Sequence, residues 1–264
     1  MPVAVITGAS KGLGRALGAA LAGRGWDLVV DARSAGPLEE AARGMRRAGA
    51  RVVALPGDVA DAAHRAELVA AARELGGLDL LVNNASVLGA EPLVRLEGHP
   101  LDGLRAALEV NAVAPLGLVQ EALPLLRASS LFGTPASSPY IGDTETSSSH
   151  TGTSTGKLSG SGGAVLNISS DAAAEAYETW GGYGAAKAAL DQLSAVLAVE
   201  EPGLRVWWVD PGDMRTDLYA AAVPADDGSG RPLPGTVVPA LLRLLDAGAA
   251  SGRYAAPGLL EGAR

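Results

Sequence analysis

Hydrophobic residues along the chain gather into short runs that alternate with longer amphipathic stretches. The short runs have the length of strands and are rich in Val and Leu without polar alternation, as expected for strands covered on both faces. They predict strands at residues 3–6, 28–32, 52–55, 78–82, 164–168, 204–209 and 252–255. The amphipathic stretches predict helices at residues 13–24, 38–48, 62–75, 101–127, 183–199 and 237–245. This alternation predicts one α/β domain over residues 1–264, built on a doubly wound parallel sheet whose ligands bind at the carboxyl ends of the strands.

One segment departs from this pattern. Between residues 129 and 163, 23 of the 35 residues are Ser, Thr or Gly, and few are apolar. Such a composition predicts a flexible, low-complexity insertion within the domain. Without it, residues 125–127 would lead by a short turn to residues 164–166, so the insertion should enter at the amino end of its strand, opposite the ligand-binding edge. We therefore expect its removal to leave turnover intact.

Composition narrows the chemistry available to the chain. Of its 264 residues, 48% are hydrophobic and 4% aromatic, so the core is built mainly from Ala, Val and Leu. The formal charge is 21 − 29 = −8 with scattered basic residues, which argues against a nucleic-acid partner. There is no Cys, and His64, His99 and His150 are too far apart to predict a metal site. The start lacks a charged segment before an apolar one, and no apolar stretch reaches about 18 residues, which predicts a soluble, cytoplasmic protein without a membrane partner.

The first predicted strand is followed by a glycine-rich turn and a helix. The glycines allow a tight turn, and the helix amino terminus would direct free N–H groups and a positive dipole at a pyrophosphate. The spacing is neither that of a P-loop nor the usual G-x-G-x-x-G, so an ordinary glycine-rich turn is the alternative. The candidate cofactor-binding residues of this turn are Thr7, Gly8, Ser10, Lys11, Gly12, Leu13 and Gly14.

The end of the second predicted strand bears on which dinucleotide would bind. At this place a dinucleotide fold either binds the adenosine ribose hydroxyls through an acid or pairs a cation with a 2′-phosphate. Asp31 fits the first case and Arg33 the second, and Lys11 could share the phosphate with Arg33. We favour NADP(H) as the cofactor, with NAD(H) as the alternative. The simpler interpretations are a turn acid at Asp31 and a solvated strand end at Arg33.

Hydroxyl groups and a Tyr–Lys pair follow the fifth predicted strand. Ser169 and Ser170 stand at the strand's end, and Tyr183 and Lys187, four residues apart, share one face of the next helix. A surface helix pair is the alternative. The chain has 18 Arg and only three Lys, however, so a lysine at position 187 is unusual for this chain and argues against a chance surface pair.

With these residues in view, the sequence resembles the short-chain dehydrogenase/reductase family of single-domain Rossmann-fold enzymes over nearly all of the chain outside the insertion. The resemblance rests on several motifs in order. They are Gly8, Gly12 and Gly14 of a T-G-x-x-x-G-x-G turn, Asp58 and Val59 as the adenine-ring pair, Asn83, Asn84 and Ala85 of N-N-A-G, Asn111 of the tetrad, Ser170 thirteen residues before Tyr183, Lys187 of Y-x-x-x-K, and Pro211, Gly212 and Thr216 of the nicotinamide-amide loop. The chain departs from the family pattern at Ser86, where glycine is usual, in the insertion, and in the short tail after Tyr254.

The resemblance implies an oxidoreductase that transfers a hydride between NADP(H) and a small carbonyl compound or secondary alcohol. It implies that Tyr183 donates the proton, that Lys187 lowers the phenol pKa together with the oxidised nicotinamide and holds the ribose, and that Ser170 binds the substrate oxygen. Asn111 would hold a water. Ala32, where NAD enzymes carry their acid, and the basic Arg33 point to NADP(H).

Two other functions remain as alternatives: a non-catalytic NADP(H)-binding sensor or scaffold, and a sugar epimerase or dehydratase on the same fold. The second is disfavoured because no extra substrate domain is evident. Loops at residues 86–91, 172–180 and 213–232 should wall the pocket, and their mixture of apolar and acidic residues predicts a modest, partly apolar substrate and a mobile lid over the last of them. The apolar faces of the helices at 101–126 and 183–199 suggest a homodimer.

Overall fold

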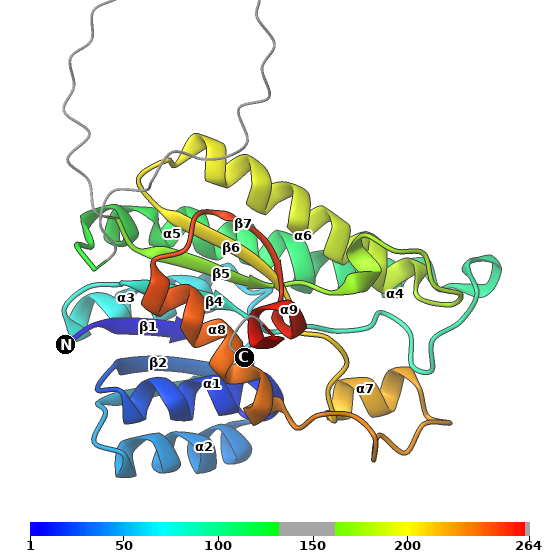
Figure 1. The fold of residues 1–264 in the computed structure, drawn as a ribbon, viewed down its shortest axis with the longest axis horizontal. Helices are drawn as coiled ribbons and strands as arrows, with labels where there is room; N and C mark the ends of the chain where they lie inside the picture. The colour runs from blue at the N-terminus through cyan, green and yellow to red at the C-terminus, as the bar shows by residue number, and fades with distance from the viewer. Residues whose placement is uncertain (132–161, 262–264) are drawn as a thin grey trace, which may run out of the picture.

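The computed structural model describes residues 1–131 and 162–261. They form a sheet of seven parallel strands with helices on both faces (Figure 1). The strands are β1 Val3–Ile6, β2 Asp27–Ala32, β3 Val52–Pro56, β4 Leu80–Asn83, β5 Ala164–Ile168, β6 Arg205–Asp210 and β7 Gly252–Ala255. Their order is β3-β2-β1-β4-β5-β6-β7. The chain thus winds from the middle of the sheet to one edge and then to the other, which confirms the predicted doubly wound fold.

Helices cover the sheet in two layers. They are α1 Gly12–Gly23, α2 Ala35–Arg47, α3 Ala62–Leu75, α4 Leu101–Leu108, α5 Ala114–Ala128, α6 Gly181–Glu200, α7 Asp217–Ala222, α8 Pro234–Ala247 and α9 Ala256–Glu261, with short 3-10 turns η1 Leu96–Gly98 and η3 Asp171–Ala173. Side chains of α1, α2 and α8 pack into the core on one face of the sheet, and those of α3 and α5 pack into the core on the other, with α6 beside them (Figure 1).

The strands divide their side chains between these two cores. In β1, Ala4 and Ile6 belong to one core and Val3 and Val5 to the other, and all four are buried. This alternation follows from the period of two along a strand. Since both faces are covered, neither set can be polar, which explains the continuous apolar runs that predicted the strands.

The helix predicted over residues 101–127 is interrupted. Between α4 and α5 the chain forms a π-helical segment, η2 Glu109–Val113. Pro115 lies at the start of α5 and has no N–H, so it cannot donate to the carbonyl of Asn111 in the α-helical pattern. π-helical bulges of this kind concentrate at functional sites.

Two short helices occupy segments in which none was predicted. α7 lies within the segment predicted as a lid, and Thr216 caps it by accepting a hydrogen bond from Tyr219 N at 3.2 Å. α9 follows β7 directly. Each has six residues, too few for a helical hydrophobic period to emerge from the sequence.

Most of the predicted insertion at residues 129–163 lies outside the described residues. Its two flanks meet near the amino ends of β4 and β5. Ser129 Oγ donates to Asp79 Oδ1 at 2.6 Å, and Gly163 N donates to Leu126 O at 2.8 Å. The connection therefore begins and ends at the edge of the sheet opposite the carboxyl ends of the strands. Among the described residues, no helix is both long and apolar enough to cross a membrane.

Candidate active site

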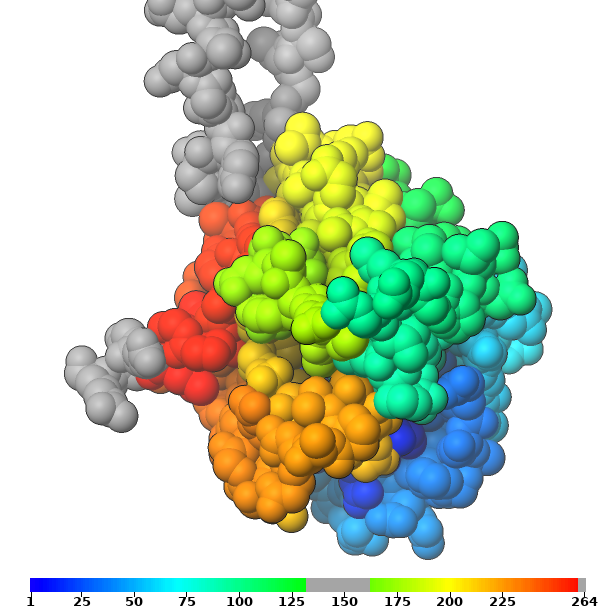
Figure 2. Space-filling model, turned by 90° about the vertical axis from the view of Figure 1, so that its right-hand side faces the viewer, coloured from blue at the N-terminus to red at the C-terminus, as the bar shows by residue number. Residues whose placement is uncertain are grey.

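A cleft of about 1300 Å³ opens at the carboxyl ends of the strands. Its walls come from the glycine turn after β1, the end of β2, the loop after β4, η3, α6 and the segment around α7. Figure 2 looks onto this face, where the segment around α7 (orange) stands across a hollow from residues around η3 (yellow-green) and around residue 100 (green). Gly8, Ser10, Lys11, Gly12 and Leu13 of the glycine turn line the same cleft as Ser170, Tyr183 and Lys187.

 The predicted site residues that do not line the cleft are Thr7, Gly14 and Asn111.

The glycine turn is shaped by contacts that leave no room for side chains. Gly8 has φ +66°, a conformation that glycine adopts without strain, and a Cβ there would lie 2.9 Å from the Cα of Ala85. A Cβ at Gly14 would lie 2.6 Å from Gly8 O and 2.6 Å from Asn84 Nδ2. Because α1 begins at Gly12, the turn presents the amino terminus of that helix to the cleft. Such a terminus is suited to bind a pyrophosphate.

Residues predicted to contact the cofactor also hold this turn in place. Thr7 Oγ1 accepts hydrogen bonds from Asn84 N at 2.9 Å and from Ala85 N at 3.0 Å. Asn84 Nδ2 donates to Thr7 O at 2.8 Å and to Gly8 O at 3.1 Å. The side chains of Thr7 and Asn84 therefore link the ends of β1 and β4, and their hydrogen bonds hold the glycine turn against the loop after β4.

Asp31 is turned into the protein. Its carboxylate accepts a hydrogen bond from Gly8 N at 2.8 Å and lies 3.1 Å from His64 Nε2, and the two side chains are 1% and 6% exposed. Burial raises the pKa of Asp31, and the hydrogen bond to Asp31 raises the pKa of His64. The Asp31 carboxylate is thus engaged with the glycine turn and His64. The NAD(H) alternative required it to bind a ribose instead.

Arg33, two residues on, is exposed and lines the cleft. Among the described residues it has no ion-pair partner within 4.0 Å. Lys11 does have one, since its Nζ lies 2.7 Å from Asp217 Oδ2 on α7. Both side chains of that pair are well exposed, so the bond contributes little to stability. Arg33 is thus a cation available to a phosphate in the cleft.

The remaining predicted cofactor residues line the cleft in different ways. Leu13 is 5% exposed with its side chain in the core, so only its backbone can serve a ligand. Gly212 has φ +72° and donates its N–H to Asp210 Oδ1 at 2.8 Å. The other predicted residues that line the cleft here are Ser10, Asp58, Val59, Pro211 and Thr216.

Tyr183 and Lys187 lie in the first turns of α6, and both are buried. Lys187 Nζ donates to Ile168 O at 2.7 Å and lies 5.6 Å from the centre of the Tyr183 ring. Burial raises the pKa of Tyr183 to about 12, because its effect is larger than that of the Ser86 and Ser170 hydroxyls, which lower the pKa. Burial also lowers the pKa of Lys187 to about 8. Among the protein's own groups, burial therefore outweighs the hydroxyls that lower the phenol pKa.

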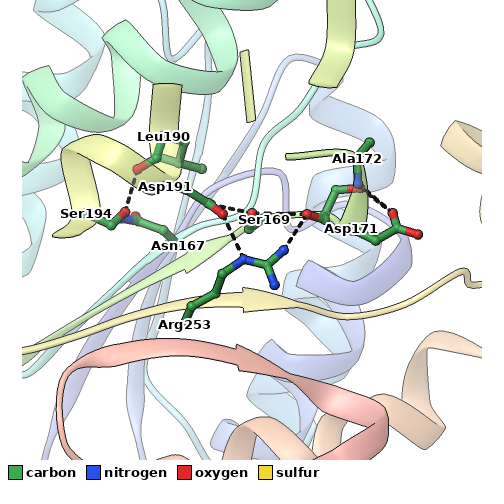
Figure 3. Close-up of polar contacts among 9 residues, drawn as sticks. Asn167, Ser169, Asp171, Ala172, Leu190, Asp191, Ser194 and Arg253 are labelled. Atoms are coloured by element: carbon green, nitrogen blue, oxygen red, sulfur yellow. Dashed lines mark hydrogen bonds and ion pairs between the residues drawn. The ribbon is translucent and has the colours of Figure 1, made fainter. Parts of the chain in front are cut away.

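The Ser170 hydroxyl acts on the phenol by lowering its pKa. Ser170 also belongs to a polar network with Asp171, Asp191 and Arg253, which are labelled in Figure 3. Its Oγ donates to Asp171 Oδ1 at 3.0 Å. Arg253, on β7, donates to the Ser170 carbonyl at 2.9 Å and to Asp191 Oδ2 at 3.0 Å, while Asp191 accepts a short hydrogen bond from Ser169 Oγ. One guanidinium thus joins the end of β5 to α6.

Asn111 is fully buried in the π-helical segment η2. Its Nδ2 donates to Val87 O and its Oδ1 accepts from Val87 N, both at 2.9 Å. The side-chain amide is therefore occupied in holding the loop after β4, and any water at this residue would have to bind the backbone carbonyl that Pro115 leaves without an α-helical donor.

The family model for short chain dehydrogenases matches residues 2–131 and 150–227. This chain belongs to the short-chain dehydrogenase family. Sepiapterin reductase of Mus musculus is 34% identical over 230 residues, which cover 83% of this chain and 77% of that protein. The rhamnolipids biosynthesis 3-oxoacyl-[acyl-carrier-protein] reductase of Pseudomonas aeruginosa is 31% identical over 203 residues, which cover 76% of this chain and 67% of that protein.

Solved structures give the same result for the fold of this short-chain dehydrogenase. The alcohol dehydrogenase of Thermococcus sibiricus, complexed with 5-hydroxy-NADP, has a TM-score of 0.77 and 25% identity, covering 97% of this chain and 95% of its own. An oxidoreductase of Escherichia coli has a TM-score of 0.80 and 24% identity, covering 97% and 94%. The enzyme is therefore an NAD(P)-dependent oxidoreductase of this family, as predicted.

Sequence reasoning missed three residues that support the site of this dehydrogenase, namely His64, Asp191 and Arg253. His64 is 33 residues from Asp31 in the chain, and Arg253 is 62 residues from Asp191 and 83 from Ser170. None of the three pairs has a spacing that a local motif would reveal. The one signal available was the acid Asp31 at the end of the second predicted strand, with no evident partner nearby.

Proposed function

We propose that this short-chain dehydrogenase transfers a hydride between NADP(H) and a small carbonyl compound or secondary alcohol, with Tyr183 as the acid and base. One observation carries the proposal. A single cleft is lined both by the glycine turn with Arg33 and by Ser170, Tyr183 and Lys187. A non-catalytic NADP(H)-binding sensor, the alternative, would need the first group of residues but not the second.

The residues of the cleft fit NADP(H). The glycine turn admits the close approach of a pyrophosphate, and Arg33 is free to hold a 2′-phosphate. The complex of the Thermococcus sibiricus enzyme with 5-hydroxy-NADP supports this choice. Pro211, Gly212 and Thr216 would contact the nicotinamide end, and Lys187 the ribose beside it. When bound, the cofactor supplies or accepts the hydride.

Tyr183 moves the proton. In carbonyl reduction its hydroxyl gives a proton to the substrate oxygen, and a phenol with a pKa of about 12 carries that proton at neutral pH. In alcohol oxidation the phenol must first lose the proton, so positive charge nearby is required. Lys187, with its pKa lowered to about 8, is still mostly charged at pH 7 and supplies part of it. Ser170 would hold the substrate oxygen, and Asn111 would bind a water through its backbone.

The walls of the cleft favour an uncharged or cationic substrate. Leu88, Trp180 and Leu218 give it an apolar side. Asp171 and Asp210 both raise the pKa of Tyr183, so their negative charges act on the place where the substrate oxygen would lie. A carboxylate on the substrate would be repelled there.

The test follows consumption of NADPH with sepiapterin, benzaldehyde, cyclohexanone and 2,3-butanedione, and with pyruvate as the anionic comparison. We expect turnover with one or more uncharged carbonyl compounds and none with pyruvate. Tyr183→Phe should abolish turnover while NADPH still binds, as followed by its fluorescence. NADPH binding without turnover of any compound would favour the sensor, and near-normal turnover by Tyr183→Phe would refute the proposed role.

Cofactor choice has a separate test. Arg33→Ala should weaken NADPH binding by about 10- to 100-fold, the worth of one or two charge-assisted hydrogen bonds. NADH lacks the 2′-phosphate, so its affinity should not change. Equal losses for both dinucleotides would show that Arg33 does not bind the phosphate.

A second copy of the chain is the partner that we propose for the exposed apolar side of η2, α5 and α6. Val113 and Leu116 are 49% and 37% exposed, and Val196 and Val199 are 41% and 74% exposed. Burying them in a homodimer would remove this apolar surface from water. Sedimentation should give a dimer, and Val199→Asp should shift it to monomer. A wild-type monomer at high concentration would exclude the assembly.

A further inference from the structure

Ser86 differs from the family pattern in that it stands where glycine is usual, directly after Asn84 and Ala85. The residue lines the cleft, yet its hydroxyl oxygen is closed off from solvent. Among the described residues, that oxygen has no partner at ordinary hydrogen-bond distance and angle. A buried hydroxyl without a partner is costly, so its position calls for an explanation.

Ser86 and Tyr183 line the same cleft, and the Tyr183 hydroxyl is a polar group on which Ser86 acts. The two are close enough for Ser86 to lower the pKa of the phenol, more than Ser170 does, although their geometry falls short of an ordinary hydrogen bond. Because no solvent reaches Ser86 Oγ, a substrate atom could not reach it either without displacing the loop. Its available partner is the phenol oxygen.

The Ser170 hydroxyl next to the phenol has its one hydrogen committed elsewhere, and Lys187 uses one of its three. The Ser170 hydroxyl donates to Asp171 Oδ1 at 3.0 Å, and Lys187 Nζ donates to Ile168 O at 2.7 Å. Asp171 on η3 and Asp210 on β6 bring negative charge that disfavours a phenolate. The hydroxyl hydrogen of Ser86 has no such acceptor, so it can turn to the phenol oxygen.

We infer that Ser86 is a positioning residue that donates a hydrogen bond to the Tyr183 oxygen and stabilises its phenolate form during the reaction. The inference rests on the proposed function. In reduction, the O–H bond of Tyr183 breaks and its proton forms the new O–H bond of the alcohol, while the hydride comes from NADPH. Ser86 keeps its own proton throughout, and its hydrogen bond shortens as negative charge gathers on the phenol oxygen.

The test is the pH dependence of alcohol oxidation with NADP⁺, using the secondary alcohol made from whichever compound of the carbonyl panel is reduced. Oxidation needs the phenolate, so its rate rises with pH through the pKa of Tyr183. Ser86→Ala should move that midpoint upward by about one unit and lower the rate at a fixed pH below it by about ten-fold. Ser86→Gly should behave as Ser86→Ala does, whereas Ser86→Thr, which keeps the hydroxyl, should retain the wild-type midpoint.

Ser194→Ala is the matched control, because Ser194 has a buried hydroxyl on α6 that bonds Asn167 and Leu190 rather than the phenol. It should leave the midpoint unchanged, and NADP⁺ binding should persist in every variant. An unshifted midpoint in Ser86→Ala, with Tyr183→Phe inactive, would overturn the inference and leave the proposed function standing. If neither the wild type nor any variant turns over a compound, the proposed function falls, and the role of Ser86 falls with it.

Discussion

Replacing Gly14 with alanine tests whether the first turn of α1 must lie against the glycine turn. A Cβ atom at position 14 would stand 2.6 Å from Gly8 O and 2.6 Å from Asn84 Nδ2, whereas ordinary contacts begin at 3.4 Å. One side must therefore move by about 3.4 − 2.6 = 0.8 Å. Asn84 cannot swing aside without breaking its bonds to Thr7 O and Gly8 O. The glycine turn itself must shift.

Two free energies oppose each other in this variant. Overpacking costs about 1–3 kcal/mol, and alanine in place of glycine within a helix returns about 1 kcal/mol. We expect a net destabilisation of about 1 kcal/mol, which lowers Tm by about 2–4 °C in a protein of this size. The effect on binding should be larger, since a displacement near 1 Å in a positioning element can cost about 100-fold.

The assay pairs thermal unfolding with fluorescence titration of NADPH. Gly23→Ala is the matched control, because it lies at the end of the same helix and an added Cβ would meet nothing within 4 Å. That control should bind NADPH as the wild type does, with an equal or higher Tm. If Gly14→Ala binds NADPH as tightly as Gly23→Ala does, close approach at the turn is not required and the reasoning is wrong.

Three further predictions concern other parts of the molecule. Because burial lowers the pKa of Lys187 to about 8, its ammonium loses charge as pH rises through that value. NADPH affinity should therefore fall above pH 8, and the affinity of Lys187→Met should show no such fall. Arg253→Gln removes the bonds to Asp191 and the Ser170 carbonyl, and should lower kcat several-fold without changing NADPH affinity; a normal kcat would contradict this. Excising residues 132–161 should leave kcat and KM unchanged, because their flanks lie at the opposite edge of the sheet, and lost activity in a folded variant would count against it.

Several features of this protein follow from local sequence alone. The apolar runs indicated strands such as β1 because burial on both faces requires apolar side chains at successive positions. The spacing of Gly8, Gly12 and Gly14 indicated the cofactor turn, since backbone conformation and close approach depend on the residue itself. The four-residue spacing of Tyr183 and Lys187 indicated one face of α6, since residues four apart are neighbours on a helix surface.

The tertiary structure decided how side chains are shared between elements. Asp31 and Arg33 pointed to different cofactors in the sequence, and only the contact of Asp31 with Gly8 and His64 shows which of them faces inward. The tertiary structure likewise adds Asp217 as an ion-pair partner of Lys11, which the sequence had proposed for the phosphate.

The physical reason is the separation in sequence between the residues that interact. A strand, a turn or a helical face depends on residues a few positions apart, so its pattern is written in contiguous sequence. A hydrogen bond between elements depends on strand order and on which loops meet at one edge of the sheet. Arg253 reaches the Ser170 carbonyl only because β7 and β5 lie on either side of β6, an arrangement that no local pattern in this chain contains.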